Sequence, residues 1–383
     1  MRILYVTALS VDVDSASLQR MIGVAAAWGV CGHEVLIVGQ GGAERRTTCF
    51  ANVRIEGIGT ARDAGRARRI LSANGVSTWL DGYTAPTDVV VVYGGTSRLT
   101  AVVKAWARQR GVSRVIDSVE WYEPSSFTGG KFGPRAVDNE WSMRRRFPAY
   151  DGAIAISRLL ETHYRSSGTR EVVRVPPLVD TRAIDHPTVG ERSEGPIRLL
   201  YAGNPGPKDS LGRVVRVLGD LDGQGQHIRL QVLGVTPEEA VNLPEMPAVL
   251  PDSAEFCGRV TREEVLVALR QAHFVPIIRR SEKYAHAGFS TKLVEAMSSG
   301  VAVLANPTSD MAEHVRDGVT GVLATDSSVA AVRDSLERVL SLGPAAAEKL
   351  GIAAREHAES AFDYRRHSVA LDRFVVSVAK EPA

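Results

Sequence analysis

Cysteine is scarce in this sequence, and long apolar runs are absent. Its 383 residues include only Cys31, Cys49 and Cys257, which lie far apart and in no metal-ligand spacing. Scattered cysteines in an odd number argue against disulfides and structural zinc, and they favour a reducing compartment such as the cytoplasm. No window approaches the roughly 18 consecutive apolar residues that a membrane-spanning helix needs. We therefore predict a soluble, cytoplasmic chain without disulfides or a bound metal.

Glycine is missing from one turn where a dinucleotide-binding protein needs it. The fingerprint G-x-G-x-x-G should follow the first β-strand of a nicotinamide enzyme. After "RILYV", however, the sequence runs "TALSVDVDSAS" without glycine. A nicotinamide enzyme is thereby disfavoured. Asp12 and Asp14 in this turn form a single D-x-D, which is weak evidence for a metal-diphosphate site, and we interpret them as solvated loop residues.

Charge of one sign does not dominate, because 46 Lys and Arg nearly balance 44 Asp and Glu. Arginine clusters nevertheless occur at 66–69 and 144–146. Such runs are usually solvated faces. The alternative is a peripheral contact with anionic lipid or with a phosphate-bearing acceptor. Aromatic interleaving and zinc-finger spacing are both absent, so no nucleic-acid partner is predicted.

Apolar strands alternate with helical patterns along the chain, which indicates an α/β fold with parallel sheets. The chain is too long for one ordinary core and suggests two domains. We predict a doubly wound domain over 1–185 and a second one over 186–364, with a helix at 365–383 packing back on the first. The strand-like segments of the first half are "RILYVT", "HEVLIVG", "DVVVVYGG", "SRVIDSVEW", "DGAIAISR" and "EVVRVPPLVD". Those of the second half are "IRLLYAG", "IRLQVLG", "AEFCGRV", "FVPIIRR", "AVLAN" and "TGVLA".

Residues 284–323, "YAHAGFSTKLVEAMSSGVAVLANPTSDMAEHVRDGVTGVL", resemble the donor-nucleotide motif of retaining family 4 glycosyltransferases (glycosyl transferases group 1). The likeness also covers "GHEVLIV", "AISRLLETHY", "RVPPLVD" and "LLYAGNPGPKDS". It implies the GT-B fold, in which two Rossmann-like domains face each other across a cleft. It also implies metal-independent transfer, with retention, of a sugar from a nucleotide-sugar to a hydroxyl acceptor. On family frequency the donor is a UDP-sugar, which is a substrate, so no cofactor is expected.

The turn "AGFST" opens a helix whose first backbone N–H groups suit a diphosphate. The residues that we assign to the donor here are His286, Gly288, Phe289, Ser290, Thr291, Lys292 and Glu295. Glu295 lies one helical turn beyond Thr291 on the same face, where the resemblance assigns it to the ribose hydroxyls. Lys292 either contacts a phosphate or points into solvent, and the sequence favours neither.

A second donor loop, "AGNPGPKDS", contains Gly203 and Lys208. The resemblance makes Lys208 the lysine that neutralises the leaving diphosphate. Family members often carry an arginine before that lysine, but Asn204 and Pro205 stand in that stretch here. An arginine at the end of "FVPIIRR" is a candidate replacement. Strand alternation lets only one of these two side chains point inward, and we favour Arg279, with a surface salt bridge as the alternative.

The N-terminal half is expected to bind the acceptor through "VIDSVEWYEPSS", residues 115–126, which places carboxylates and aromatic rings at a strand end. Family members often have a histidine nearby that touches the donor sugar. None is present here, and Glu120 is the candidate replacement. Ala287 stands where the family has a glutamate that holds a sugar hydroxyl. The donor then lacks that hydroxyl, or another residue such as His286 holds it.

Two other functions stay open at this point. A nucleotide-sugar epimerase also has two doubly wound domains, although it needs an acid and a base beside the sugar and no clear pair is present. A donor-binding protein without catalysis is suggested by Ala287. The acceptor stays open between a glycan, a lipid-linked sugar and a small natural product.

Overall fold

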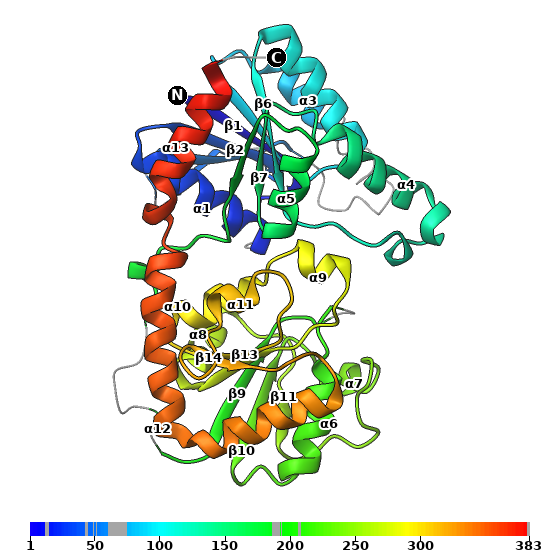
Figure 1. Ribbon diagram of the computed structural model, residues 1–383. Coiled ribbons are helices and arrows are strands. Elements are labelled where there is room, and N and C mark those ends of the chain that lie inside the picture. Colours follow the sequence, from blue (N-terminus) through cyan, green and yellow to red (C-terminus); the bar gives the residue numbers. More distant parts are fainter. Residues whose placement is uncertain are drawn as a thin grey trace. The chain divides into compact units, whose positions relative to one another are not determined.

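The computed structural model describes residues 1–11, 15–42, 45–48, 50, 52–59, 75–185, 192, 194–205 and 208–380. Asp12, Asp14, Cys49 and the arginine cluster at 66–69 lie outside these described residues. The chain divides into two compact units, shown in Figure 1. Unit 1 comprises Met1–Val179, Ala287–Phe289 and Asp363–Ala383, and unit 2 comprises Asp180–His286 and Ser290–Phe362.

Unit 1 is built on an eight-stranded sheet in the order β3-β4-β2-β1-β5-β6-β7-β8. Only β3 pairs antiparallel; the other seven strands are parallel. The strands are β1 (Arg2–Ser10), β2 (Glu34–Gln40), β3 (Arg45–Thr47), β4 (Val53–Gly57), β5 (Val89–Tyr93), β6 (Ser113–Ser118), β7 (Gly152–Ala155) and β8 (Glu171–Arg174). The order reverses between β1 and β5, which is typical of a doubly wound sheet.

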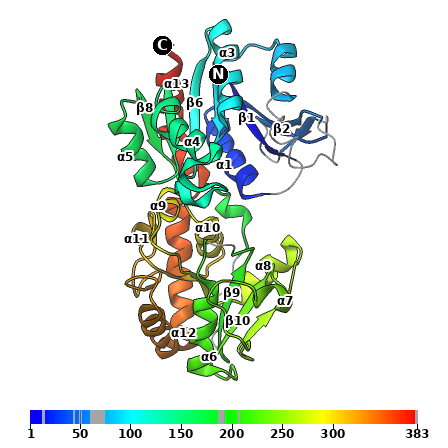
Figure 2. The same ribbon diagram turned by 90° about the vertical axis from the view of Figure 1, so that its right-hand side faces the viewer.

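Helices cover both faces of this sheet. They are α1 (Ala16–Val30), residues 75–82, α3 (Ser97–Arg110), α5 (Arg158–Ser166) and α13 (Tyr364–Lys380), while the short helix α4 (Pro134–Trp141) lies beyond them (Figure 1). Val89 and Val91 of β5 join one apolar cluster, whereas Val90 and Val92 join another on the opposite face. This double burial explains why β5 is a continuous apolar run. Helices α1 and α13 lie side by side in both views (Figure 1 and Figure 2).

Unit 2 contains a six-stranded, fully parallel sheet in the order β11-β10-β9-β12-β13-β14. Its strands are β9 (Ile197–Ala202), β10 (Ile228–Leu233), β11 (Ala254–Phe256), β12 (Phe274–Ile277), β13 (Ala302–Ala305) and β14 (Gly321–Leu323). Its helices are α6 (Leu211–Asp222), α7 (Pro237–Ala240), α8 (Arg262–Gln271), α9 (Lys283–Ala287), α10 (Thr291–Ser298), α11 (Met311–His314) and α12 (Val329–Ala361). The prediction of two Rossmann-like domains is confirmed.

The polar segment between the two sheets, residues 180–196, is anchored at several described positions, including Arg192. Arg192 is buried, and its Nη2 donates to the carbonyl of Gly300 at 2.7 Å. The carbonyl of Arg192 lies 2.7 Å from Nε2 of His273. Burial lowers the pKa of His273 to about 4, so the ring is neutral near pH 7 and donates this hydrogen bond through one nitrogen.

Helix α12 bends at Gly343 and Pro344. Gly343 has a φ of 69°, outside the helical region, and Pro344 lacks a backbone N–H. The described residues contain no helix that is long and apolar enough to cross a membrane.

Candidate functional site

In unit 2, loops that follow neighbouring strands meet around the carboxylate of Asp209. Asp209 lies in the loop between β9 and α6, next to Lys208. Arg279 follows β12, and its Nε donates to Oδ1 of Asp209 at 2.8 Å. Lys292, in the first turn of α10, donates from Nζ to Oδ2 at 2.8 Å. In a parallel sheet these loops share the carboxyl edge, where ligands bind in such folds.

The Asp209 carboxylate is ionised and nearly excluded from water. Its side chain is 4% exposed, and those of Arg279 and Lys292 are 11% and 18% exposed. Burial by itself would raise the pKa of Asp209, but Lys292 and Arg279 lower it to about 2. One negative and two positive charges leave this cluster with a net charge of +1, to which the neighbouring Lys208 adds. The arrangement favours an anionic ligand.

Tyr201, at the end of β9, completes the contacts of Asp209. Its hydroxyl donates to Oδ2 at 2.6 Å, and Nζ of Lys292 lies 4.7 Å from the centre of its ring. Burial, followed by the charge of Asp209, raises the pKa of Tyr201 far above its usual range. The phenol therefore stays protonated and holds the carboxylate in place.

Helix α10 begins beside this cluster without a side-chain cap. Ser290 is the N-cap residue, yet its side chain accepts no bond from the helix N–H groups. Nη2 of Arg279 instead donates to Oγ of Ser290 at 3.4 Å. The first turn of α10, at Thr291 and Lys292, thus keeps the N-terminal dipole available for an anion.

Gly203 allows the loop after β9 to turn away from the sheet. Its φ is +116°, a region that residues with a side chain rarely adopt. A Cβ there would lie 3.6 Å from Cε of Lys292. Gly203 therefore lies next to one of the two cations.

The side chains of the two arginines after β12 point in different directions, as strand alternation predicts. Arg279 points into the cluster, and its backbone is fixed by Asn306, whose side chain accepts from its N–H and donates to its carbonyl, both at 2.8 Å. The side chain of Arg280 is 46% exposed and donates to Glu245 at 2.6 Å. The surface salt bridge that was the alternative for Arg279 is formed by Arg280 instead.

Glu295 and His286, two other residues of the donor motif, make polar contacts outside the Asp209 cluster. Glu295 is the fifth residue of α10, and its carboxylate is 42% exposed and 3.9 Å from Nη1 of Arg262. His286 lies in α9, with Nε2 2.8 Å from Oγ of Ser281 and Nδ1 accepting from the backbone of Ser309 at 3.3 Å. It therefore has polar neighbours of its own.

Ala287, Gly288 and Phe289 group with unit 1 by their contacts. Ala287 is fully buried in an apolar cluster of that unit, and Phe289 packs against the same cluster. The structure accounts for the absence of a carboxylate at 287, because a charge there would be buried among apolar side chains.

The candidate acceptor segment of unit 1 contains three carboxylates: Glu120 is exposed, Glu123 is half-buried and Asp117 is buried. Glu120 is exposed and accepts a hydrogen bond from the hydroxyl of Tyr122. Asp117 is fully buried, accepts from Nη2 of Arg20 at 2.7 Å and also accepts from the hydroxyl of Tyr5. Asp117 therefore forms a core ion pair and has no access to a sugar.

Trp121, in the same segment, is also buried. Its Nε1 donates to Oε1 of Glu140 at 2.8 Å, and its ring lies 4.5 Å from that of His163. Its apolar surface is therefore used for packing. Glu120 stays the acceptor-side candidate of this segment.

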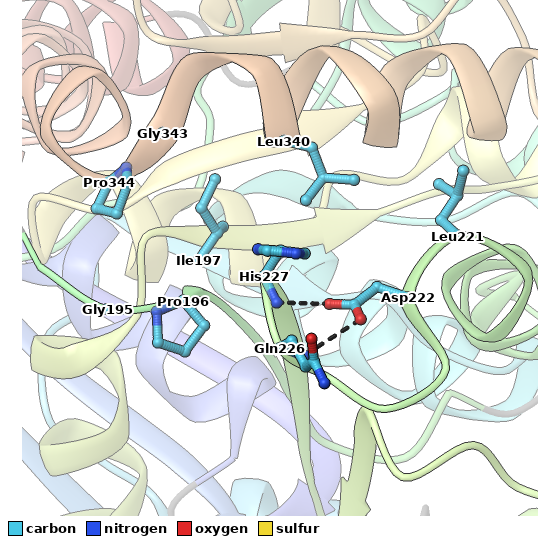
Figure 3. Close-up of a pocket in the computed structure, with 10 residues that line it drawn as sticks. All are labelled: Gly195, Pro196, Ile197, Leu221, Asp222, Gln226, His227, Leu340, Gly343 and Pro344. Atoms are coloured by element: carbon cyan, nitrogen blue, oxygen red, sulfur yellow. Dashed lines mark hydrogen bonds between the residues drawn. The ribbon is translucent and has the colours of Figure 1, made fainter.

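A separate cavity of about 410 Å³ lies at the opposite edge of the unit 2 sheet (Figure 3). It is lined by residues at the amino ends of two strands, including Ile197 of β9 and His227 before β10. The carboxylate of Asp222 accepts from the backbone N–H groups of Gln226 and His227 at 3.2 and 2.6 Å. This carboxylate fixes a turn, and the cavity is not part of the Asp209 cluster.

Sequence reasoning missed Asp209, the residue that Arg279 and Lys292 both contact. The available signal was its position, because an acid directly after Lys208 in a Gly- and Pro-rich loop is placed at a strand's carboxyl end. Of the predicted residues, the structure brings Gly203, Arg279, Ser290 and Lys292 together with the loop of Lys208.

The two parallel-sheet units have the GT-B fold. Residues 196–341, which include the Asp209 cluster, match the family model described as "Glycosyl transferases group 1". A D-inositol 3-phosphate glycosyltransferase of Mycobacterium sp. (strain KMS) is 31% identical over 137 residues. That match covers 34% of this chain and 29% of the relative, so the chain spans under a third of the curated relative's length.

Solved structures resemble the chain over nearly all of its length. Sucrose-phosphate synthase from Thermosynechococcus elongatus gives a TM-score of 0.73 at 15% identity, covering 97% of this chain and 98% of that one. HepE from Anabaena, in complex with UDP-glucose, gives 0.65 at 15% identity, covering 98% of each chain. At such identities the likeness establishes the fold.

Proposed function

We propose that the protein is a retaining glycosyltransferase that moves a sugar from a UDP-sugar to a hydroxyl acceptor. The carrying observation is the net positive Asp209 cluster at the start of α10. Its residues lie within the segment that matches the glycosyltransferase family model. The UDP-glucose complex of the Anabaena protein, which has the same fold, supports UDP as the nucleotide.

The cluster would act on the leaving diphosphate. Arg279 has five N–H donors and Lys292 has three, so each keeps donors beyond those given to Asp209. Together with Lys208 and the start of α10 they stabilise the charge that develops as the bond to the sugar breaks. Donors that are fixed before the reaction need little reorganisation.

Retention requires no protein base in this proposal. The acceptor hydroxyl attacks the face that the diphosphate leaves, and a diphosphate oxygen takes its proton. Glu120 of unit 1, which has the Tyr122 hydroxyl as a partner, would position the reacting sugar. The acceptor class is a glycan, a lipid-linked sugar or a small natural product.

Replacing Glu295 by alanine is expected to weaken binding of both UDP and UDP-glucose by about 1.5 to 3 kcal/mol, because a charged acceptor of ribose hydrogen bonds is lost. Isothermal titration with both ligands measures this loss. Glu337→Ala, at an exposed glutamate of α12, is the matched control and should leave both affinities unchanged. Wild-type affinity of Glu295→Ala for UDP would contradict the ribose assignment, and failure of the wild type to bind any nucleotide-sugar would contradict the function.

Transfer is expected to continue in excess EDTA. The described residues contain no group of three His, Cys, Asp or Glu side chains that could hold a metal ion, and the diphosphate is assigned to Arg279, Lys208 and Lys292. Sugar transfer with and without EDTA, followed by Mn²⁺ addition, measures this. Activity that disappears and returns with Mn²⁺ would direct attention to Asp12 and Asp14, outside the described residues.

A further inference from the structure

Exposed apolar side chains are concentrated on one short segment of unit 1. Ten large apolar side chains are exposed among the described residues, and only Phe132 and Trp141 among them are aromatic, at 83% and 55% exposure. Phe132 precedes α4, Trp141 is its last residue, and Val137, also 55% exposed, lies between them in the sequence. Val137 and Trp141 are four residues apart and therefore share one face of the helix.

Exposed basic side chains occur in the same segment. Lys131, Arg135 and Arg145 are exposed, and within the described parts of the chain none of the three has a carboxylate partner. We call these three, together with Phe132, Val137 and Trp141, the α4 surface. Nζ of Lys131 lies 5.2 Å from the ring centre of Phe132, so charge and aromatic surface are adjacent.

The two acids of α4 are neutralised by partners. Oε2 of Glu140 accepts from Nε of Arg144 at 2.7 Å. Oδ1 of Asp138 accepts from Nη1 of Arg146 at 3.0 Å. Two of the three clustered arginines are thus paired inside the segment. The net positive charge of the α4 surface comes from Lys131, Arg135 and Arg145.

We propose that the α4 surface docks on an anionic lipid bilayer. Aromatic rings and valine would enter the interfacial region, while lysine and arginine attract anionic headgroups. Charge complementarity decides for this occupant, because exposed Lys131 and Arg135 precede the two exposed apolar residues of α4 along the segment and exposed Arg145 follows them. In Figure 1, α4 lies at the margin of unit 1, beyond the helices that cover its sheet.

Sedimentation of the full chain with vesicles tests the proposal. The wild type should bind phosphatidylcholine vesicles that contain about 30% phosphatidylglycerol, and rising salt should weaken that binding because it screens the headgroup charge. Val137→Ser/Trp141→Ser should lower the partition coefficient about tenfold or more, since apolar burial is lost. Val241→Ser/Val249→Ser, at exposed valines of unit 2, is the control and should bind as the wild type does.

A second pair of variants isolates the charge. Arg135→Gln/Arg145→Gln should lower binding to anionic vesicles about tenfold and remove most of its salt dependence. Lys104→Gln/Arg108→Gln removes the same charge from exposed positions of α3 and should bind as the wild type does. All four residues lie outside the donor site, so UDP binding should be unchanged throughout.

Three results would overturn the proposal. The first is no binding either to the vesicles with phosphatidylglycerol or to vesicles of pure phosphatidylcholine. The second is equal binding to both kinds of vesicle. The third is a dimer in sedimentation velocity that Val137→Ser/Trp141→Ser abolishes, because the α4 surface would then be covered by a second copy of the chain.

Discussion

Replacing Asp209 by alanine is expected to lower the free energy of unfolding of unit 2 by about 3 to 5 kcal/mol, because removing one partner leaves buried charges uncompensated. Arg279 and Lys292, only 11% and 18% exposed, would each lose the carboxylate at 2.8 Å. The hydroxyl of Tyr201 would lose its acceptor as well.

Chemical denaturation measures this effect with an internal reference. All five tryptophans lie in unit 1, so their fluorescence follows that unit, while far-UV circular dichroism follows both. The loss of stability in Asp209→Ala is expected in the unfolding transition that circular dichroism follows. Asp220→Ala is the matched control, because Asp220 forms an exposed pair with Arg333 at 2.7 Å and should cost less than about 1 kcal/mol. Equal effects of the two substitutions would contradict the structural role of Asp209.

The same carboxylate makes stability depend on pH in the acid range. The pKa of Asp209 falls from 3.8 to about 2, so the ionised group stabilises the folded state. That contribution, about 2.5 kcal/mol, is complete above roughly pH 4 and is lost as the pH falls through about 2. The wild type should lose stability across this window, and Asp209→Ala should show a correspondingly flatter profile.

The fold was predictable because its strands are buried on both faces. Strand β5 is apolar at all five positions, and β12 and β13 are apolar at all four of theirs, which makes parallel strands conspicuous in a sequence. Strands β3 and β4 were missed. They lie at the sheet edge, where β3 has three residues and β4 alternates buried and partly exposed positions in the short segment "VRIEG".

The candidate donor site was only partly predictable, because the contacts of its side chains depend on partners distant in the sequence. Arg279 was chosen over Arg280 by strand alternation alone. Asp209 could not be assigned, since its contacts with Arg279 and Lys292 join positions 70 and 83 residues apart. Asp117 was placed near the acceptor, but its partner Arg20, 97 residues away, makes it part of the core.

Replacing Lys208 by alanine is expected to lower kcat by about 30- to 1000-fold, equivalent to roughly 2 to 4 kcal/mol of lost transition-state stabilisation. The fold should survive, because the surrounding loop is held through its backbone: the carbonyl of Lys208 accepts from the hydroxyl of Tyr284 at 3.3 Å, and the N–H of Ser210 donates to the carbonyl of Ile278 at 2.7 Å.

The loss of Lys208 should appear in turnover more than in UDP affinity, because charge on the diphosphate grows as the bond to the sugar breaks and a lysine beside it matters most at that point. Lys349→Ala, at an exposed lysine of α12 in the same unit, removes the same charge far along the chain from the donor loop and should leave kcat unchanged. Steady-state kinetics of both variants with a UDP-sugar, together with their melting temperatures, distinguish a loss of turnover from a loss of folding. Wild-type turnover in Lys208→Ala would mean that the diphosphate depends on Arg279, Lys292 and the start of α10 without this lysine.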